Sequence, residues 1–127
     1  MKKLTICLIF FSILILSSVR ANAMGFSEAI NQSKPAAVLI YADWADNAQG
    51  VVSAFNTQAG AYSDRYNFVQ INIADNVAKE FNKTYHIYPN LPYVLLFKDK
   101  GRMSRYLKSD CVTQSSCFKE KLDMFLN

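Results

Sequence analysis

Two cysteines near the C-terminus, Cys111 and Cys117, are the residues whose chemistry stands out most clearly in this chain. Thiols so close in sequence form structural disulfides in proteins that leave the cytoplasm, and closing this short loop stabilises a fold by roughly 2 kcal/mol. The pair could instead exchange disulfides, because Cys117 lies near the start of a predicted helix, whose dipole favours a thiolate. A metal site needs more ligands than two thiols and the lone His86 supply, so we expect no metal and no cofactor.

Other side chains that could perform acid–base chemistry have simpler explanations. His86 has no serine or cysteine near it in sequence, so we interpret it as a loop residue. Asp43 and Asp46 fit a solvated loop and a helix cap better than a catalytic pair. We expect Asp46 or Asn47 to cap the helix that follows. We expect no catalytic residue here.

The first 23 residues are typical of a secretory signal peptide. A basic start at Met1–Lys3 precedes an apolar run at Leu4–Leu16 and an A-x-A cleavage site at Ala21–Ala23. The run is shorter than the roughly 20 residues that span a bilayer, and Cys7 lies far from the cleavage site, which argues against a lipid anchor. We predict cleavage after Ala23 and a periplasmic or secreted product; the alternative is an uncleaved N-terminal anchor.

The charge of the remaining chain excludes two classes of partner. The chain has fourteen basic and ten acidic residues, and three of the basic ones lie in the leader: Lys2, Lys3 and Arg20. Residues 24–127 therefore carry a net charge near +1, which supports neither nucleic-acid binding nor attraction to an anionic membrane. We expect one small domain over 24–127, with no nucleic acid and no membrane as partner after cleavage.

Apolar periodicity in residues 24–127 predicts alternating strands and helices, which is typical of an α/β fold. We expect strands at 36–42, 68–73, 93–98 and 102–107. Helices are expected at 26–32, from 48 onward, at 77–85 and at the C-terminus. Two of them have apolar residues three and four apart, which predicts buried faces: Ala48, Val51, Val52, Phe55 and Ala59 in one, and Phe118, Leu122, Phe125 and Leu126 in the other.

The strand, loop and helix around residues 41–48 resemble the active-site segment of the thioredoxin family. That family has W-C-G-P-C at this place, and this chain has Trp44, Ala45, Asp46, Asn47 and Ala48. Further pieces follow in the family's order, including Leu91-Pro92 before a strand, at the position of the family's cis-proline. Lys34-Pro35 and the phrase Tyr-Ala-Asp-Trp are also similar to the C-terminal domain of bacterial thiol-disulfide interchange proteins.

The resemblance implies a thioredoxin-like three-layer sandwich, with a mixed central sheet flanked by helices. It also implies that the family's reaction is lost, because Ala45 and Ala48 replace the attacking and resolving thiols. Leu39 stands where the family keeps a buried carboxylate, and Gln70 where it often keeps a lysine. A buried carboxylate is costly without a function, so this replacement agrees with the loss of the thiols.

A peptide-binding groove is the property that the resemblance implies should survive. By position, Trp44 forms one wall and Leu91 before Pro92 offers its backbone to an extended peptide. Tyr88 and Tyr93 add an aromatic rim, which suits a protein partner. The alternative is that Tyr93 points into the sheet and Tyr88 covers the edge of the core.

These observations predict an exported thioredoxin-fold protein that binds an exported or envelope protein or peptide, as an accessory subunit of an envelope or secretion assembly. The enzyme alternative is thiol-disulfide exchange through the relocated pair Cys111 and Cys117. A third class, a structural domain of a larger complex, is not separated from the first by the sequence.

Overall fold

The computed structural model describes residues 25–127, and the predicted signal peptide lies outside the described residues. In chain order the elements are α2 (Phe26–Ile30), β1 (Ala36–Tyr41), α3 (Ala48–Tyr62), β2 (Asn67–Asn72), α4 (Asn76–Tyr85), β3 (Tyr93–Lys98), β4 (Met103–Lys108), α5 (Ser109–Thr113) and α6 (Ser115–Leu126). The expected strands and helices are present, with bounds shifted by one or two residues. The short helix α5 was not anticipated.

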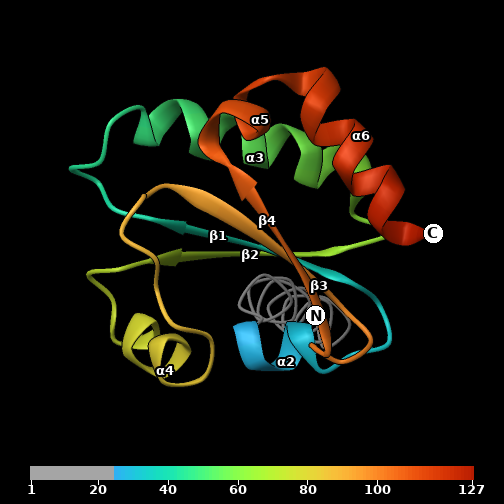
Figure 1. The fold of residues 1–127 in the computed structure, drawn as a ribbon, viewed down its shortest axis with the longest axis horizontal. Coiled ribbons are helices and arrows are strands. Elements are labelled where there is room, and N and C mark those ends of the chain that lie inside the picture. Colours follow the sequence, from blue (N-terminus) through green and yellow to red (C-terminus); the bar gives the residue numbers. More distant parts are fainter. Residues whose placement is uncertain (1–24) are drawn as a thin grey trace, which may run out of the picture.

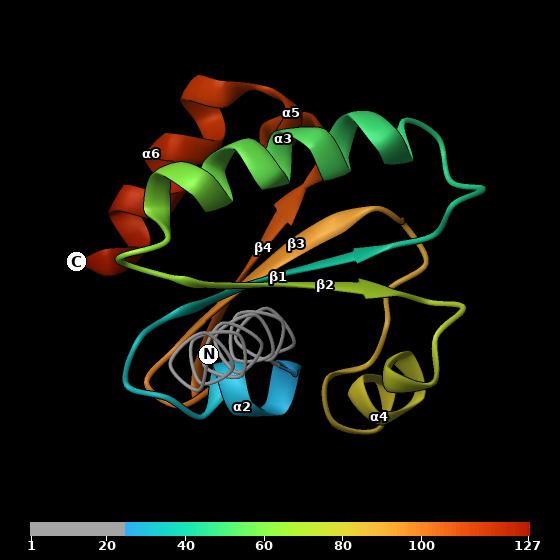
Figure 2. The same cartoon turned by 180° about the vertical axis from the view of Figure 1, so that it is seen from behind.

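The four strands form one mixed sheet in the order β2-β1-β3-β4. β1 runs parallel to β2 and antiparallel to β3, and β3 and β4 form an antiparallel hairpin. Helices cover both faces of the sheet: α3, α5 and α6 lie on one side and α2 and α4 on the other (Figures 1 and 2). The expected three-layer α/β arrangement is therefore the one observed.

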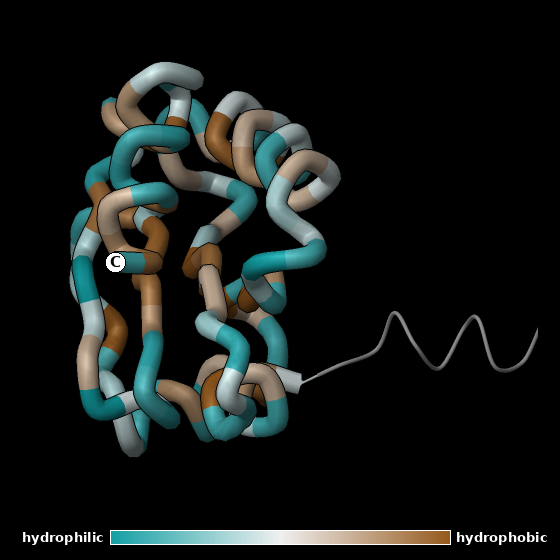
Figure 3. The backbone as a smooth tube through the Cα atoms, turned by 90° about the vertical axis from the view of Figure 1, so that its right-hand side faces the viewer, coloured by the Kyte–Doolittle hydropathy of each residue, from teal (hydrophilic) through white to brown (hydrophobic). Residues whose placement is uncertain are grey.

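Two apolar layers, one on each face of the sheet, form the core. β1 and β3 are buried almost along their whole length, as expected for strands that helices cover on both faces. Alternate residues of these strands point into different layers, so Leu39 joins the layer under α3 and α6 while Val38 joins the layer over α2 and α4. The tube coloured by hydropathy shows apolar stretches along the interior strands (Figure 3).

The buried stripe of helix α3 extends further toward its C-terminal end than the apolar pattern predicts, and Val52 and Ala59, which we expected on it, are only half-buried. Val51 and Phe55 are buried as expected, and Phe55 contacts Phe68 edge-on with a ring-centroid distance of 5.3 Å. Gln58 and Tyr62 are buried as well. In α6, Phe118, Leu122 and Phe125 are buried, whereas Leu126, which we expected to be buried, is exposed at the last turn of the helix.

A buried tyrosine ties the segment before β2 to the C-terminal helix. The hydroxyl of Tyr66 donates to the carbonyl oxygen of Leu122 over 2.6 Å, and its side chain is 1% exposed. Burial raises the pKa of Tyr66 strongly, and the nearby Asp123 raises this pKa further. The fold therefore depends on the neutral form of this phenol.

We predict that Tyr66→Phe lowers the free energy of unfolding by about 1–2 kcal/mol at neutral pH, because a buried hydrogen bond is lost. Because the folded pKa lies above the unfolded value of about 10, stabilisation by the phenol is complete below that pH and is lost as the pH rises further. Urea unfolding between about pH 9 and 11 should show a shallower alkaline loss in the variant than in the wild type. Equal slopes would show that Tyr66 does not carry this dependence.

Candidate functional site

Three segments meet at one end of the sheet, and the strand register places them there. Ile40 near the end of β1 lies opposite Tyr93 at the start of β3, and Tyr93 lies opposite Lys108 at the end of β4. The loop 42–47, the turn 88–92 and the start of α5 therefore lie at the same end of the sheet, and the loop and the turn are seen at the left of Figure 1. This end of the sheet is the candidate site.

The loop between β1 and α3 exposes an indole and lacks any thiol. Trp44 is 75% exposed, whereas Ala48 is only 6% exposed and starts α3. Asn47 precedes the helix in a left-handed conformation, but its side chain makes no capping hydrogen bond. It lies instead over Gly50, where a Cβ atom would come within 2.3 Å of Asn47 Oδ1. The prediction that the side chain of Asp46 or Asn47 caps α3 is therefore wrong: Asn47 occupies the capping position but makes no capping hydrogen bond.

The turn before β3 has the expected cis peptide bond between Leu91 and Pro92. Pro92 is buried and Leu91 is half-buried. The N–H of Leu91 donates to the carbonyl oxygen of Pro89 over 3.0 Å, so it is already occupied. No residue in the described range donates to the Leu91 carbonyl, which leaves this oxygen as the acceptor that the turn can offer.

A cluster of three tyrosines supports this turn. Tyr93 is fully buried, so it forms no part of an exposed rim; its hydroxyl accepts a hydrogen bond from the N–H of Tyr88 at 3.0 Å. Tyr88 is 45% exposed and its ring contacts both Tyr93 and Tyr106, with centroid distances of 5.4 and 5.7 Å. Burial raises the pKa values of Tyr93 and Tyr106. The sequence alone missed Tyr106, because only the β3–β4 register brings it here.

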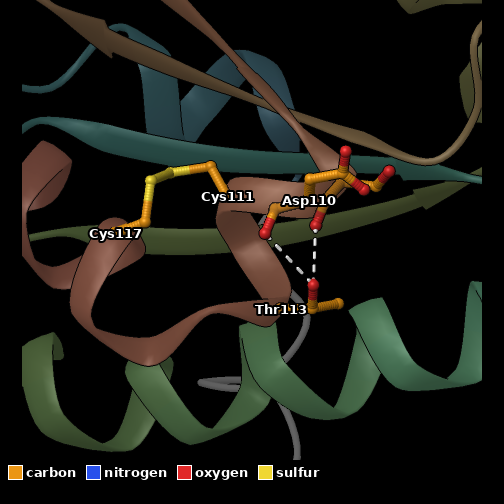
Figure 4. The surroundings of a disulfide bond; sticks show 5 residues. Asp110, Cys111, Thr113 and Cys117 are labelled. Atoms are coloured by element: carbon orange, nitrogen blue, oxygen red, sulfur yellow. Dashed lines mark hydrogen bonds between the residues drawn. A yellow bond between two sulfur atoms is a disulfide. The ribbon is translucent and has the colours of Figure 1, made fainter.

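Cys111 in α5 and Cys117 in the first turn of α6 are joined by a disulfide, with Cα atoms 5.2 Å apart (Figure 4). Both residues are half-buried. They border a cavity of about 430 Å³ together with Lys108, Lys121 and Tyr106. Through Tyr106, the disulfide therefore neighbours the tyrosine cluster.

The Thr113 hydroxyl stabilises α5 by donating to the carbonyl oxygens of Ser109 and Asp110, each at 3.2 Å (Figure 4). Helix α6 begins at Ser115, so the residue that precedes it is Gln114. The Gln114 side chain makes no capping hydrogen bond. The disulfide thus joins two helices whose ends lack side-chain caps.

A second cavity, of about 740 Å³, lies on the other side of the loop, between the end of β1 and α3. Its lining includes Tyr41, Asp43 and Asn56. Asp43 accepts a hydrogen bond from Asn72 of β2 over 3.3 Å, and Asn56 accepts one from Gln70 of β2. The cavity therefore borders β2 and was not anticipated from the sequence.

The described residues include neither a candidate metal centre nor a candidate membrane span. No cluster of three or more histidine, cysteine or acidic side chains suited to a metal occurs in residues 25–127. Among these residues, no helix combines the length and apolarity needed to cross a membrane.

Comparison with known proteins supports the fold. No family model matches the chain. The thioredoxin-like protein HCF164 of rice chloroplasts (Oryza sativa subsp. japonica) is 35% identical over 65 residues, which are 51% of this chain and only 24% of that protein. The X-ray structure of Fasciola hepatica thioredoxin aligns with a TM-score of 0.59 and 14% identity, over 74% of this chain and 83% of that one.

The chain has the thioredoxin-like fold, as the resemblance in its sequence implied. The match to the rice protein spans about a quarter of its length and carries no activity over to this chain. Ala45 in the loop and Ala48 at the start of α3 leave this segment of the fold without thiols.

We predict that replacing both Cys111 and Cys117 by serine lowers the free energy of unfolding by about 2 kcal/mol, because the loop that they close is short. Denaturant unfolding of oxidised wild type, reduced wild type and the double variant measures the effect. Reduction should destabilise the wild type by a similar amount and leave the variant unchanged. An unchanged stability on reduction would show that the disulfide adds nothing to the fold.

Proposed function

We propose that this protein binds extended segments of exported or envelope proteins at the sheet end that carries Trp44, and that it does so without thiol chemistry in its loop. The observation that carries the proposal is the 75% exposure of the Trp44 indole, in the loop that follows β1 at the same end of the sheet as the turn 88–92. Covering a large exposed aromatic side chain removes apolar surface from water, which favours association with a partner.

The backbone of the turn complements this indole. The unoccupied Leu91 carbonyl would accept a hydrogen bond from the N–H of a bound segment, and the half-exposed Tyr88 ring would add contact area. Tyrosine and tryptophan give large contact surfaces at a small cost in conformational entropy. The partner class is therefore a peptide or a protein loop with apolar side chains.

The cellular setting of the proposal rests on the leader. A basic start, an apolar run and an A-x-A site favour export, so the partners we propose are periplasmic, secreted or envelope proteins. An accessory subunit of an envelope or secretion assembly fits a small binding domain with no catalytic group in its loop. A purely structural domain in such an assembly would use the same surface.

We predict that Trp44→Ala and Tyr88→Ala each weaken capture of partners while leaving the melting temperature nearly unchanged. Loss of a central aromatic contact typically costs about 2 kcal/mol or more, which is roughly a thirtyfold loss of affinity. Crosslinking in the native envelope identifies the partners, and binding of the purified proteins measures the effect.

Met103→Ala is the matched control, because Met103 is 51% exposed and lies at the opposite end of β4 from the site. It should bind like the wild type. The proposal fails if Trp44→Ala lowers the melting temperature and captures normally, since Trp44 would then serve only the fold.

Thiol-disulfide exchange through Cys111 and Cys117 is a second candidate, favoured by one observation. The half-buried sulfurs border a cavity that also contains Lys108 and Lys121, and cationic neighbours favour a thiolate. In such a reaction one thiolate of the reduced pair attacks a substrate disulfide and forms a mixed disulfide. The second thiol then displaces it, which oxidises the pair and reduces the substrate to two thiols.

We predict that the wild-type protein does not reduce insulin disulfides at rates like those of a thioredoxin, because Ala45 and Ala48 replace both loop thiols. The assay uses dithiothreitol as the reductant and a thioredoxin as the positive control. Turnover that disappears in the Cys111→Ser, Cys117→Ser variant would assign exchange to the relocated pair. Turnover that survives in this variant would contradict both proposals, because neither the loop nor the relocated pair would then supply the thiols.

A further inference from the structure

The outer edge of β2 is a row of backbone groups with no partner in the described chain. The N–H groups of Asn67 and Ile73 donate to the carbonyls of Pro35 and Tyr41, at 2.8 and 2.9 Å. In a parallel pair the N–H and C=O of one residue point to the same side, and alternate residues point to opposite sides. Odd-numbered residues of β2 therefore face β1, and Phe68, Gln70 and Asn72 direct their backbone groups outward.

Helices cover the faces of β2 and leave this edge open. Val69 and Ile71 are buried in the layer over α2 and α4, whereas Gln70 is exposed. Among residues 25–127, β2 pairs with β1 alone, and no turn or loop hydrogen bond uses the backbone N–H or C=O of Phe68 or Gln70, or the N–H of Asn72. The carbonyl of Asn72 accepts from Asp75 at the turn that follows the strand.

The two outer strands of the sheet differ in how they are protected. β4 includes Arg105 and Lys108 among its exposed residues, and charges of this kind oppose pairing with another strand. β2 has the sequence Asn-Phe-Val-Gln-Ile-Asn, without any charged residue or proline. Because an edge strand without such protection pairs readily, β2 is the edge suited to a partner.

We propose that β2 pairs antiparallel with β2 of a second copy of this chain, around a two-fold axis at Gln70. Gln70 then faces Gln70 of the other copy, and Phe68 faces Asn72. In this register the N–H of Gln70 meets the carbonyl of Gln70 in the other copy, and the N–H of Asn72 meets the carbonyl of Phe68. The N–H of Phe68 meets the carbonyl of Asn72, which also accepts from Asp75, so the edge is self-complementary. An uncharged strand suits such pairing, because a charged residue at the two-fold axis would face the same charge in the other copy.

The neighbouring cavity adds surface to this contact. Asn72 and Gln70 are hydrogen-bonded to Asp43 and Asn56, which line the cavity of about 740 Å³ beside β2. Phe68 of the second copy would lie opposite Asn72, at the border of this cavity. A six-residue strand is a small contact by the standard of stable interfaces of about 1,600 Å², so we expect a dimer that dissociates on dilution.

Charge exchange at Gln70 tests the pairing. Gln70→Lys and Gln70→Glu each place like charges across the two-fold axis, so each variant alone should dissociate about fivefold or more readily than the wild type. An equimolar mixture of the two variants should recover the dimer, because Lys then faces Glu. Sedimentation velocity over a range of concentrations measures the masses, and the exposed Gln114→Lys serves as the matched control.

Amide hydrogen exchange gives a readout that locates the contact. The N–H groups of Phe68 and Gln70 should become protected as the concentration of the wild type rises, while those of Val69 and Ile71 stay protected throughout. A monomer at all concentrations would overturn the proposal, as would a dimer unaffected by Gln70→Lys. Protection of Phe68 and Gln70 in a monomer would also overturn it, because another segment would then cover the edge.

Discussion

The position of β1 at the centre of the sheet is the constraint on which the rest of the structure depends. β1 pairs with β2 on one side and β3 on the other, and both of its faces are buried under helices. The backbone N–H and C=O groups of β1 therefore form hydrogen bonds with the two neighbouring strands and need no water, so the strand can be almost wholly apolar and buried. Because the register of β3 follows from this pairing, the end of β1 also determines where Trp44 and the turn before Tyr93 come together.

This geometry explains how the loop that carries Trp44 is positioned without thiols. Trp44 is placed by the strand that precedes it and by the helix that follows, and neither depends on a cysteine. Ala48 is buried at the first turn of α3, and the Asn47 side chain fills the space over Gly50. The site therefore keeps its shape through backbone pairing and small residues.

The sequence predicted the order of the elements and the two interior strands, because the apolar runs at β1 and β3 are long and bounded by Pro35 and Pro92. It predicted less of the site. Tyr93 and Tyr88 are close in sequence, but only the three-dimensional arrangement shows that one is buried and the other exposed. Alternation along a strand does not tell which face is covered until the helices are placed.

Other features escaped prediction for reasons of register and packing. Tyr106 reaches the site because it lies opposite Leu95 in the hairpin, a pairing that no local pattern specifies. Gln58 is buried in α3 with its amide donating to Ser115, and a polar residue on an apolar face gives no signal in the sequence. The side-chain cap expected for α3 is absent, because the Asn47 side chain lies over Gly50.

The burial of Leu39 bears on whether the lost chemistry is reversible. Leu39 is fully enclosed in the apolar layer with Val51 and Phe55, at the position where the resemblance places a proton-accepting carboxylate. New cysteines at positions 45 and 48 would thus meet a hydrocarbon wall in place of an internal base. Moving a carboxylate into that layer would leave a charge without solvent, a change that costs stability before it restores any reaction. A redox loop at this place in the fold would therefore require more than two cysteine substitutions.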